Sequence, residues 1–190
     1  MPSFVSFDVV ALFTSVPVKE AINIIGDILR KDDTLSQRTD LSVKQVLGLL
    51  EYCLTTTYFQ YACKFYEQVE GAAMGSPLSL LVTNLFMEHF EQGTIETFKY
   101  NLIFLAWYVE DVIAVIKRAQ YDELLRHLNN QHKAIQWTDE REVDSHLPAI
   151  NVDTVRESDS SLIFKVYRKP THTDQYLDFE SNQPLQHKLG

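Results

Sequence analysis

The amino-acid sequence predicts an α+β fold in which helices back an antiparallel sheet. Segments with strand-like alternation are interleaved with segments that repeat apolar residues at helical spacing. Several predicted strands follow one another through short turns, which is typical of antiparallel pairing. With 190 residues and 45% hydrophobic content, the chain can form one or at most two domains, and we expect a single domain over residues 1–190.

The first half of the chain predicts a strand, two helices and a hairpin. Ser3–Val10 is rich in Phe and Val, and a turn at Thr14–Pro17 follows it. Helical spacing of apolar residues predicts helices over Val18–Lys31 and Ser42–Leu54, with Ser42 as N-cap. The aromatic-rich segment Tyr58–Val69 predicts a hairpin whose rings pack on the core, with stacking on bases as the alternative. These rings belong to Tyr58, Phe59, Tyr61, Phe65 and Tyr66.

The second half predicts a long helix, a second hairpin and further strands. Gly71–Ser79 is a glycine-punctuated loop in which Ser76 and Pro77 are suited to open a helix that runs to about Phe98. The other predicted elements are strands over 101–108 and 112–117, a helix over 121–132, paired strands over 152–155 and 162–166, and an irregular tail from 168.

Composition excludes several classes of protein. No apolar run reaches the ~18–20 residues of a membrane span, and the N-terminus lacks the features of a signal peptide, so we expect no membrane partner. Cys53 and Cys63 match no common zinc motif and favour an intracellular location, nuclear or cytoplasmic. The net charge of -9 by itself argues against nucleic-acid binding, although a carboxylate metal site or the lack of basic partner segments would also make the chain acidic.

Three carboxylates stand among apolar residues. Asp8 closes the first strand, and Glu110 and Asp111 lie at the tip of the second hairpin. A charge embedded in apolar strands needs a partner, and a divalent cation is an economical one. Two such ions can clamp the attacking and leaving oxygens of a phosphoryl displacement. On spacing alone, an ordinary solvated hairpin tip is the simpler interpretation of Glu110 and Asp111.

Four segments resemble, in order, the motifs of reverse transcriptases from Penelope-like retroelements. They are Ser6–Pro17 (SFDVVALFTSVP), Gly71–Ser79 (GAAMGSPLS), Tyr108–Asp111 (YVED) and Val166–Leu177 (VYRKPTHTDQYL), which Ser181–Lys188 (SNQPLQHK) continues. The resemblance implies a right-hand polymerase palm and an RNA-directed DNA polymerase. It also implies two Mg²⁺ or Mn²⁺ ions, an RNA or DNA template-primer and deoxynucleotide triphosphates.

The resemblance also implies roles for single residues. Asp8 would bind both metals, Glu110 would be the second bridging carboxylate, and Asp111 would be auxiliary. Phe13 falls at the steric gate that favours deoxynucleotides; apart from the resemblance it is a core aromatic. The resemblance also implies substrate contacts at Gly75 and Ser76, for which an ordinary capped helix is the simpler interpretation. It implies phosphate contacts for four residues of the tail, for which a solvated loop is the simpler interpretation: Arg168, Lys169, His172 and Lys188.

The sequence departs from the family pattern at three places. Glu110 replaces an aspartate, and its extra methylene shifts the carboxylate by ~1.5 Å, where a misplacement of ~1 Å can cost ~10²-fold in rate. The family's Leu-Pro-Phe-Leu-Asp-Val run is Leu147–Val152 (LPAINV), which predicts a lost core ring and a lost charge. The chain also begins close to the first motif, so we expect it to lack the fingers and thumb segments of a longer polyprotein.

Three functional hypotheses follow from the sequence. The first is a reverse-transcriptase palm that performs two-metal nucleotidyl transfer. The second is a degenerate, inactive remnant of that domain with at most residual nucleic-acid binding. The third is an unrelated α+β interaction domain whose acidic hairpin is surface decoration, in which case Asp8 and Glu110 would lie far apart.

Overall fold

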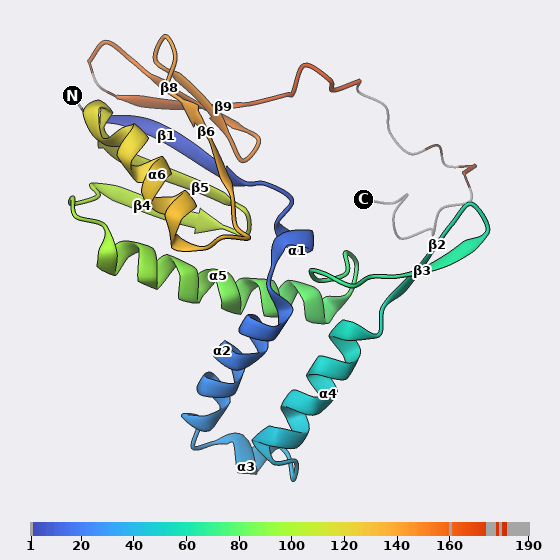
Figure 1. Ribbon diagram of the computed structural model, residues 1–190. Helices are drawn as coiled ribbons and strands as arrows, with labels where there is room; N and C mark the ends of the chain where they lie inside the picture. The colour runs from blue at the N-terminus through green and yellow to red at the C-terminus, as the bar shows by residue number, and fades with distance from the viewer. Residues whose placement is uncertain (1, 160, 174–177, 179, 182–190) are drawn as a thin grey trace. The chain divides into compact units, whose positions relative to one another are not determined.

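The computed structural model describes residues 2–159, 161–173, 178 and 180–181, which fall into two compact units, residues 1–143 and 144–190. The first unit contains a four-stranded antiparallel sheet in the order β4-β5-β1-β6. Its strands are β1 (Pro2–Val9), β4 (Phe104–Tyr108), β5 (Asp111–Lys117) and β6 (Trp137–Arg141). This mixture of helices and antiparallel sheet confirms the predicted fold class (Figure 1).

Helices of the first unit bury one face of this sheet. Phe90 of α5 (Pro77–Thr97) contacts Trp107 of β4 and Trp137 of β6, with ring centroids 6.2 and 5.7 Å apart. The Asn129 side chain of α6 (Tyr121–Gln131) donates to the Trp137 carbonyl oxygen. The strand residues on this face belong to one continuous apolar core that includes Val5, Phe7, Val9, Val112, Ala114 and Ile116.

Among the remaining helices, the two longer ones form an antiparallel pair. The short helix α1 (Leu12–Ser15) leads into α2 (Val18–Arg30), and α3 (Leu35–Arg38) connects α2 to α4 (Val43–Thr55) (Figure 1). Ser42 caps α4 in a capping box, because its hydroxyl accepts from the Gln45 amide while the Gln45 side chain accepts from the Ser42 amide. The predicted helices over 18–31, 42–54, 77–98 and 121–132 are thus confirmed to within two residues.

The predicted aromatic hairpin forms, but its rings do not pack on the core. It consists of β2 (Tyr58–Tyr61) and β3 (Lys64–Glu67), and all eight strand residues are exposed. Phe65 and Tyr61 retain 77% and 72% of their accessible surface. The prediction of core packing was therefore wrong, because the hairpin pairs only with itself within a two-stranded sheet.

The second unit is a three-stranded antiparallel sheet in the order β7-β8-β9. The pair β8 (Val152–Arg156) and β9 (Leu162–Val166) was predicted, whereas β7 (His146–Ala149) was not. Ile150 and Asn151 connect β7 to β8 with φ values of 48° and 60°. Asparagine is among the residues that tolerate this conformation, so the turn explains why Asn is suited to position 151. Ala149 is half-exposed, so its small side chain leaves no void in a buried core there, contrary to expectation.

No helix among the described residues is both long and apolar enough to cross a membrane.

Candidate active site

Asp8 and Asp111 lie directly opposite each other on neighbouring antiparallel strands. Opposed residues of an antiparallel pair point to the same face, with Cβ atoms about 4.5–5.5 Å apart. The same row continues to Tyr108 on β4 and to Thr138 on β6. The sheet register therefore brings together a carboxylate of the first motif and a carboxylate of the third, on the face that α5 does not cover.

Asp8 is exposed, whereas the sequence predicted a carboxylate embedded among apolar residues. Phe7 and Val9 are 1% and 4% exposed and point toward the helices. Because side chains alternate along a strand, Asp8 points to the opposite, open face. Among the described residues, none donates a hydrogen bond to its carboxylate or forms an ion pair with it. The prediction of a buried charge that needs a partner was therefore wrong, although the carboxylate is available to a ligand.

The turn that carries Glu110 is tied to the first motif and is strained. The Val9 amide donates to the Glu110 carbonyl oxygen at 3.2 Å. Val109 has a φ of 54°, a conformation that is costly for a β-branched residue, and strain of this kind costs about 1–3 kcal/mol. A two-residue hairpin turn such as the one between Tyr108 and Asp111 requires a positive φ at this position. The backbone of Glu110 is thus held beside Val9, whereas Asp111 takes the position directly opposite Asp8.

The donor set fits a magnesium ion only in part. Within the described ranges, no group of three or more His, Cys, Asp or Glu side chains is arranged to hold a metal ion. Mg²⁺ is commonly bound by one or two carboxylates, with water and substrate phosphates as its other ligands. The opposed pair Asp8 and Asp111 meets this smaller requirement.

Phe13 belongs to α1 and is half-buried next to the second motif. The Ala72 amide donates to the Phe13 carbonyl oxygen at 2.6 Å. Gly71 has a φ of 71°, and a Cβ added there would lie 2.5 Å from the Thr14 carbonyl oxygen. The first and second motifs are therefore joined backbone to backbone. Sequence reasoning missed Gly71, although a glycine at the start of this loop was the available indication.

Gly75 and Ser76 open helix α5 as predicted. Gly75 has a φ of 88°, and a Cβ added there would have no other atom within 4 Å. Ser76 is the N-cap residue and Pro77 follows in the first turn, but the Ser76 hydroxyl makes no capping hydrogen bond. The backbone at this point is consequently open enough for a second molecule to approach.

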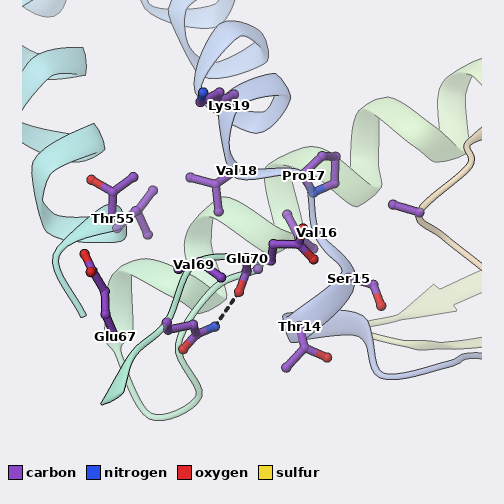
Figure 2. A pocket seen from close by; sticks show the side chains of 14 residues that line it. Thr14, Ser15, Val16, Pro17, Val18, Lys19, Thr55, Glu67, Val69 and Glu70 are labelled. Atoms are coloured by element: carbon purple, nitrogen blue, oxygen red, sulfur yellow. Dashed lines mark hydrogen bonds between the residues drawn. The ribbon is translucent and has the colours of Figure 1, made fainter. Parts of the chain in front are cut away.

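A cavity of about 750 Å³ lies beside the first motif, but it is separate from the carboxylates. Its lining comes from the segment Thr14–Lys19, the end of α4 and the segment Glu67–Gly71, with Ala134. Figure 2 shows Thr14 and Ser15 on one side and Glu67 and Glu70 on the other. None of the predicted site residues lines it. The candidate site is thus an open sheet face, and the cavity is a separate feature next to α1.

Arg168 and Lys169 lie in the second unit, where with His172 they line a shallow hollow of about 540 Å³. The His172 amide donates to the Lys169 carbonyl oxygen at 2.8 Å, which closes a tight turn. Three basic or titratable side chains are thus gathered on one surface. The predicted contact Lys188, and residues 174–177 and 182–188 of the resembling segment, lie outside the described residues.

The fold is similar to that of solved telomerases. The apo telomerase of Candida tropicalis truncated from its C-terminal domain has a TM-score of 0.61 at 11% identity, over 87% of this chain and 35% of that one. The apo telomerase of the same organism has a TM-score of 0.61 at 11% identity, over 87% and 32%. Telomerase from Candida albicans, in complex with a TWJ fragment of telomeric RNA, has a TM-score of 0.58 at 12% identity, over 85% and 30%.

No protein-family model matches the chain, and no curated protein does. The chain spans about a third of the length of these telomerases. At such low identity, the similarity concerns the fold. The chain therefore has the fold of the part of these telomerases that it covers.

Proposed function

We propose that the chain is the palm of an RNA-directed DNA polymerase from a Penelope-like retroelement. The observation that carries this proposal is the register of β1 and β5, which places Asp8 opposite Asp111 on an open sheet face. The motif resemblance selects the element family, and the telomerase-like fold supports the reaction class. Its substrates are an RNA or DNA template-primer and deoxynucleotide triphosphates.

The carboxylates of Asp8 and Asp111 would hold Mg²⁺ or Mn²⁺, with Glu110 at the turn as a further oxygen donor. When bound, such ions stabilise the attacking and leaving oxygens of an in-line phosphoryl displacement. The chain itself contributes position: the sheet fixes Asp8 and Asp111, and the Val9–Glu110 hydrogen bond fixes the turn.

Other residues would bind and select the nucleotide and the primer. The Ala72–Phe13 hydrogen bond fixes the backbone at Phe13, whose ring would exclude a 2′-hydroxyl. The open backbone at Gly75 and Ser76 would let a base pair approach α5. Arg168 and Lys169, exposed in the second unit, would contact phosphates.

Metal binding is the direct test. Calorimetric titration of the full chain should show heat of Mn²⁺ binding, and Mn²⁺ should raise the unfolding temperature. Both effects should disappear in Asp8→Asn. Glu140→Gln is the matched control, because Glu140 is an exposed carboxylate on the same sheet face, paired with Ser6 two residues before Asp8. Equal Mn²⁺ binding by wild type and Asp8→Asn would refute the site.

Primer extension separates the active domain from the second candidate, an inactive remnant. The remnant is favoured by Glu110 in place of aspartate and by the lack of a third arranged ligand among the described residues. Mn²⁺-dependent extension that is retained in Glu140→Gln and lost in Asp8→Asn is the expected result. Metal binding without extension, even for Glu110→Asp, would select the remnant.

A further inference from the structure

The hairpin β2–β3 presents two chemically different faces. Its register pairs Phe59 with Tyr66 and Tyr61 with Lys64, so these four side chains share one face. Tyr58 pairs with Glu67 and Gln60 with Phe65, and these point to the other face. The single cation and the single anion of the segment Tyr58–Glu67 are therefore on opposite faces. We call the face formed by Phe59, Tyr61, Lys64 and Tyr66 the aromatic face.

Two of the three rings on the aromatic face stack on each other. Phe59 and Tyr66 stack with centroids 5.4 Å apart and planes inclined by 16°. Phe59, Tyr61 and Tyr66 are 53%, 72% and 42% exposed. Burying such rings is worth several kcal/mol in ordinary folding, so three of them left on one surface need an explanation.

We propose that the aromatic face binds single-stranded nucleic acid by base stacking, with Lys64 at a phosphate. This inference rests on the proposed nucleic-acid chemistry of the chain and places a second contact away from the carboxylates. Aromatic platforms that carry a cation bind unpaired strands without sequence preference, because every base has a π-face. Bases in a duplex stack on one another and leave those faces covered.

Charge and spacing both favour this occupant over a protein surface. The anion Glu67 points away from the aromatic face, so a phosphate approaching Lys64 meets no carboxylate of the hairpin strands on that side. Side chains on one face of a strand repeat every ~6.6–6.8 Å, which is about two rises of a stacked strand at ~3.4 Å each. The two cross-strand pairs thus span about two nucleotides.

The test is binding of a fluorescein-labelled, single-stranded oligonucleotide of about ten nucleotides, a length within the usual site size, to the full chain. Anisotropy is measured in EDTA, so that no metal at Asp8 contributes. Phe59→Leu and Tyr66→Leu, which keep apolar bulk but remove the ring, should each weaken binding about 5- to 150-fold. Lys64→Gln should weaken it less and reduce the slope of log affinity against log salt by about 0.7.

Phe65→Leu is the matched control, because Phe65 is a still more exposed ring of the same hairpin on the opposite face. It should bind like wild type. The inference is overturned if Phe59→Leu binds as well as wild type, or if wild type binds no single strand or prefers duplex. It is also overturned if wild type sediments as a dimer that Phe59→Leu dissociates, since a second copy would then cover the face.

Failure here is distinguishable from failure of the proposed function. If the chain neither binds Mn²⁺ nor extends a primer, but binds the oligonucleotide in a Phe59-dependent way, the polymerase proposal is refuted and the single-strand proposal stands. If primer extension depends on Asp8, but Phe59→Leu and Tyr66→Leu leave oligonucleotide binding unchanged, the single-strand proposal is refuted and the polymerase proposal stands.

Discussion

Replacing Gly71 with alanine should destabilise the first unit far more than the same change at Gly75. Both glycines have positive φ, 71° and 88°, so both variants carry the cost of left-handed backbone, about 1–2 kcal/mol. At Gly75 the added Cβ meets nothing within 4 Å. At Gly71 it would lie 2.5 Å from the Thr14 backbone, which cannot move aside as a flexible side chain could.

The additional cost at Gly71 follows from the hydrogen bond next to it. Relief of the clash must separate the loop from the first motif and lengthen the 2.6 Å bond from the Ala72 amide to the Phe13 carbonyl. Ala72 is fully buried, and a buried donor left without its acceptor costs about 1–3 kcal/mol. Gly71→Ala should therefore lose about 2–5 kcal/mol in total, against about 1–2 kcal/mol for Gly75→Ala.

Urea unfolding followed by tryptophan fluorescence measures this difference. The two tryptophans, Trp107 and Trp137, both lie in the sheet of the first unit, so the signal reports the unit that contains both glycines. A free energy of unfolding for Gly71→Ala that equals that of Gly75→Ala within ~0.5 kcal/mol would refute the reasoning. It would mean that the two motifs are not held together by backbone contact.

Four further changes have defined outcomes. Asp8→Asn should stabilise the metal-free chain by about 0.2–1 kcal/mol at low salt, because it removes a like-charge cross-strand pair; unfolding in urea measures this. Ala62→Asn with Cys63→Gly should raise the hairpin's opening free energy in amide exchange by about 1 kcal/mol, since φ at these turn residues is 49° and 60°. Ser42→Ala should cost about 0.5–2 kcal/mol of α4 stability by denaturation. Burial, and secondly the charge of Glu88, raise the pKa of Glu91 above its ordinary value of 4.5, so ionised Glu91 destabilises the folded chain. Glu91→Gln should therefore raise the unfolding temperature at pH 7. This gain should vanish as the pH falls and Glu91 becomes protonated in the folded and the unfolded chain.

The sequence predicted those elements whose evidence is local. The helix over residues 42–54 has a cap and an amphipathic stripe, and the hairpin tip at Glu110 lies between two apolar strands. It did not predict β6, because three of its five residues are charged, in the segment Asp139–Arg141. Pairing with β1, rather than strand propensity, holds that segment in the sheet.

The sequence by itself determined the α+β class, the order of most elements and the three carboxylates. Only the tertiary structure decided which carboxylates meet. The pairing of Asp8 with Asp111 depends on the register of two strands about a hundred residues apart, and a shift by one residue would turn one of them to the other face. The tertiary structure also decided that Asp8 is exposed and that the hairpin aromatics remain uncovered, since burial depends on which other segments pack against an element.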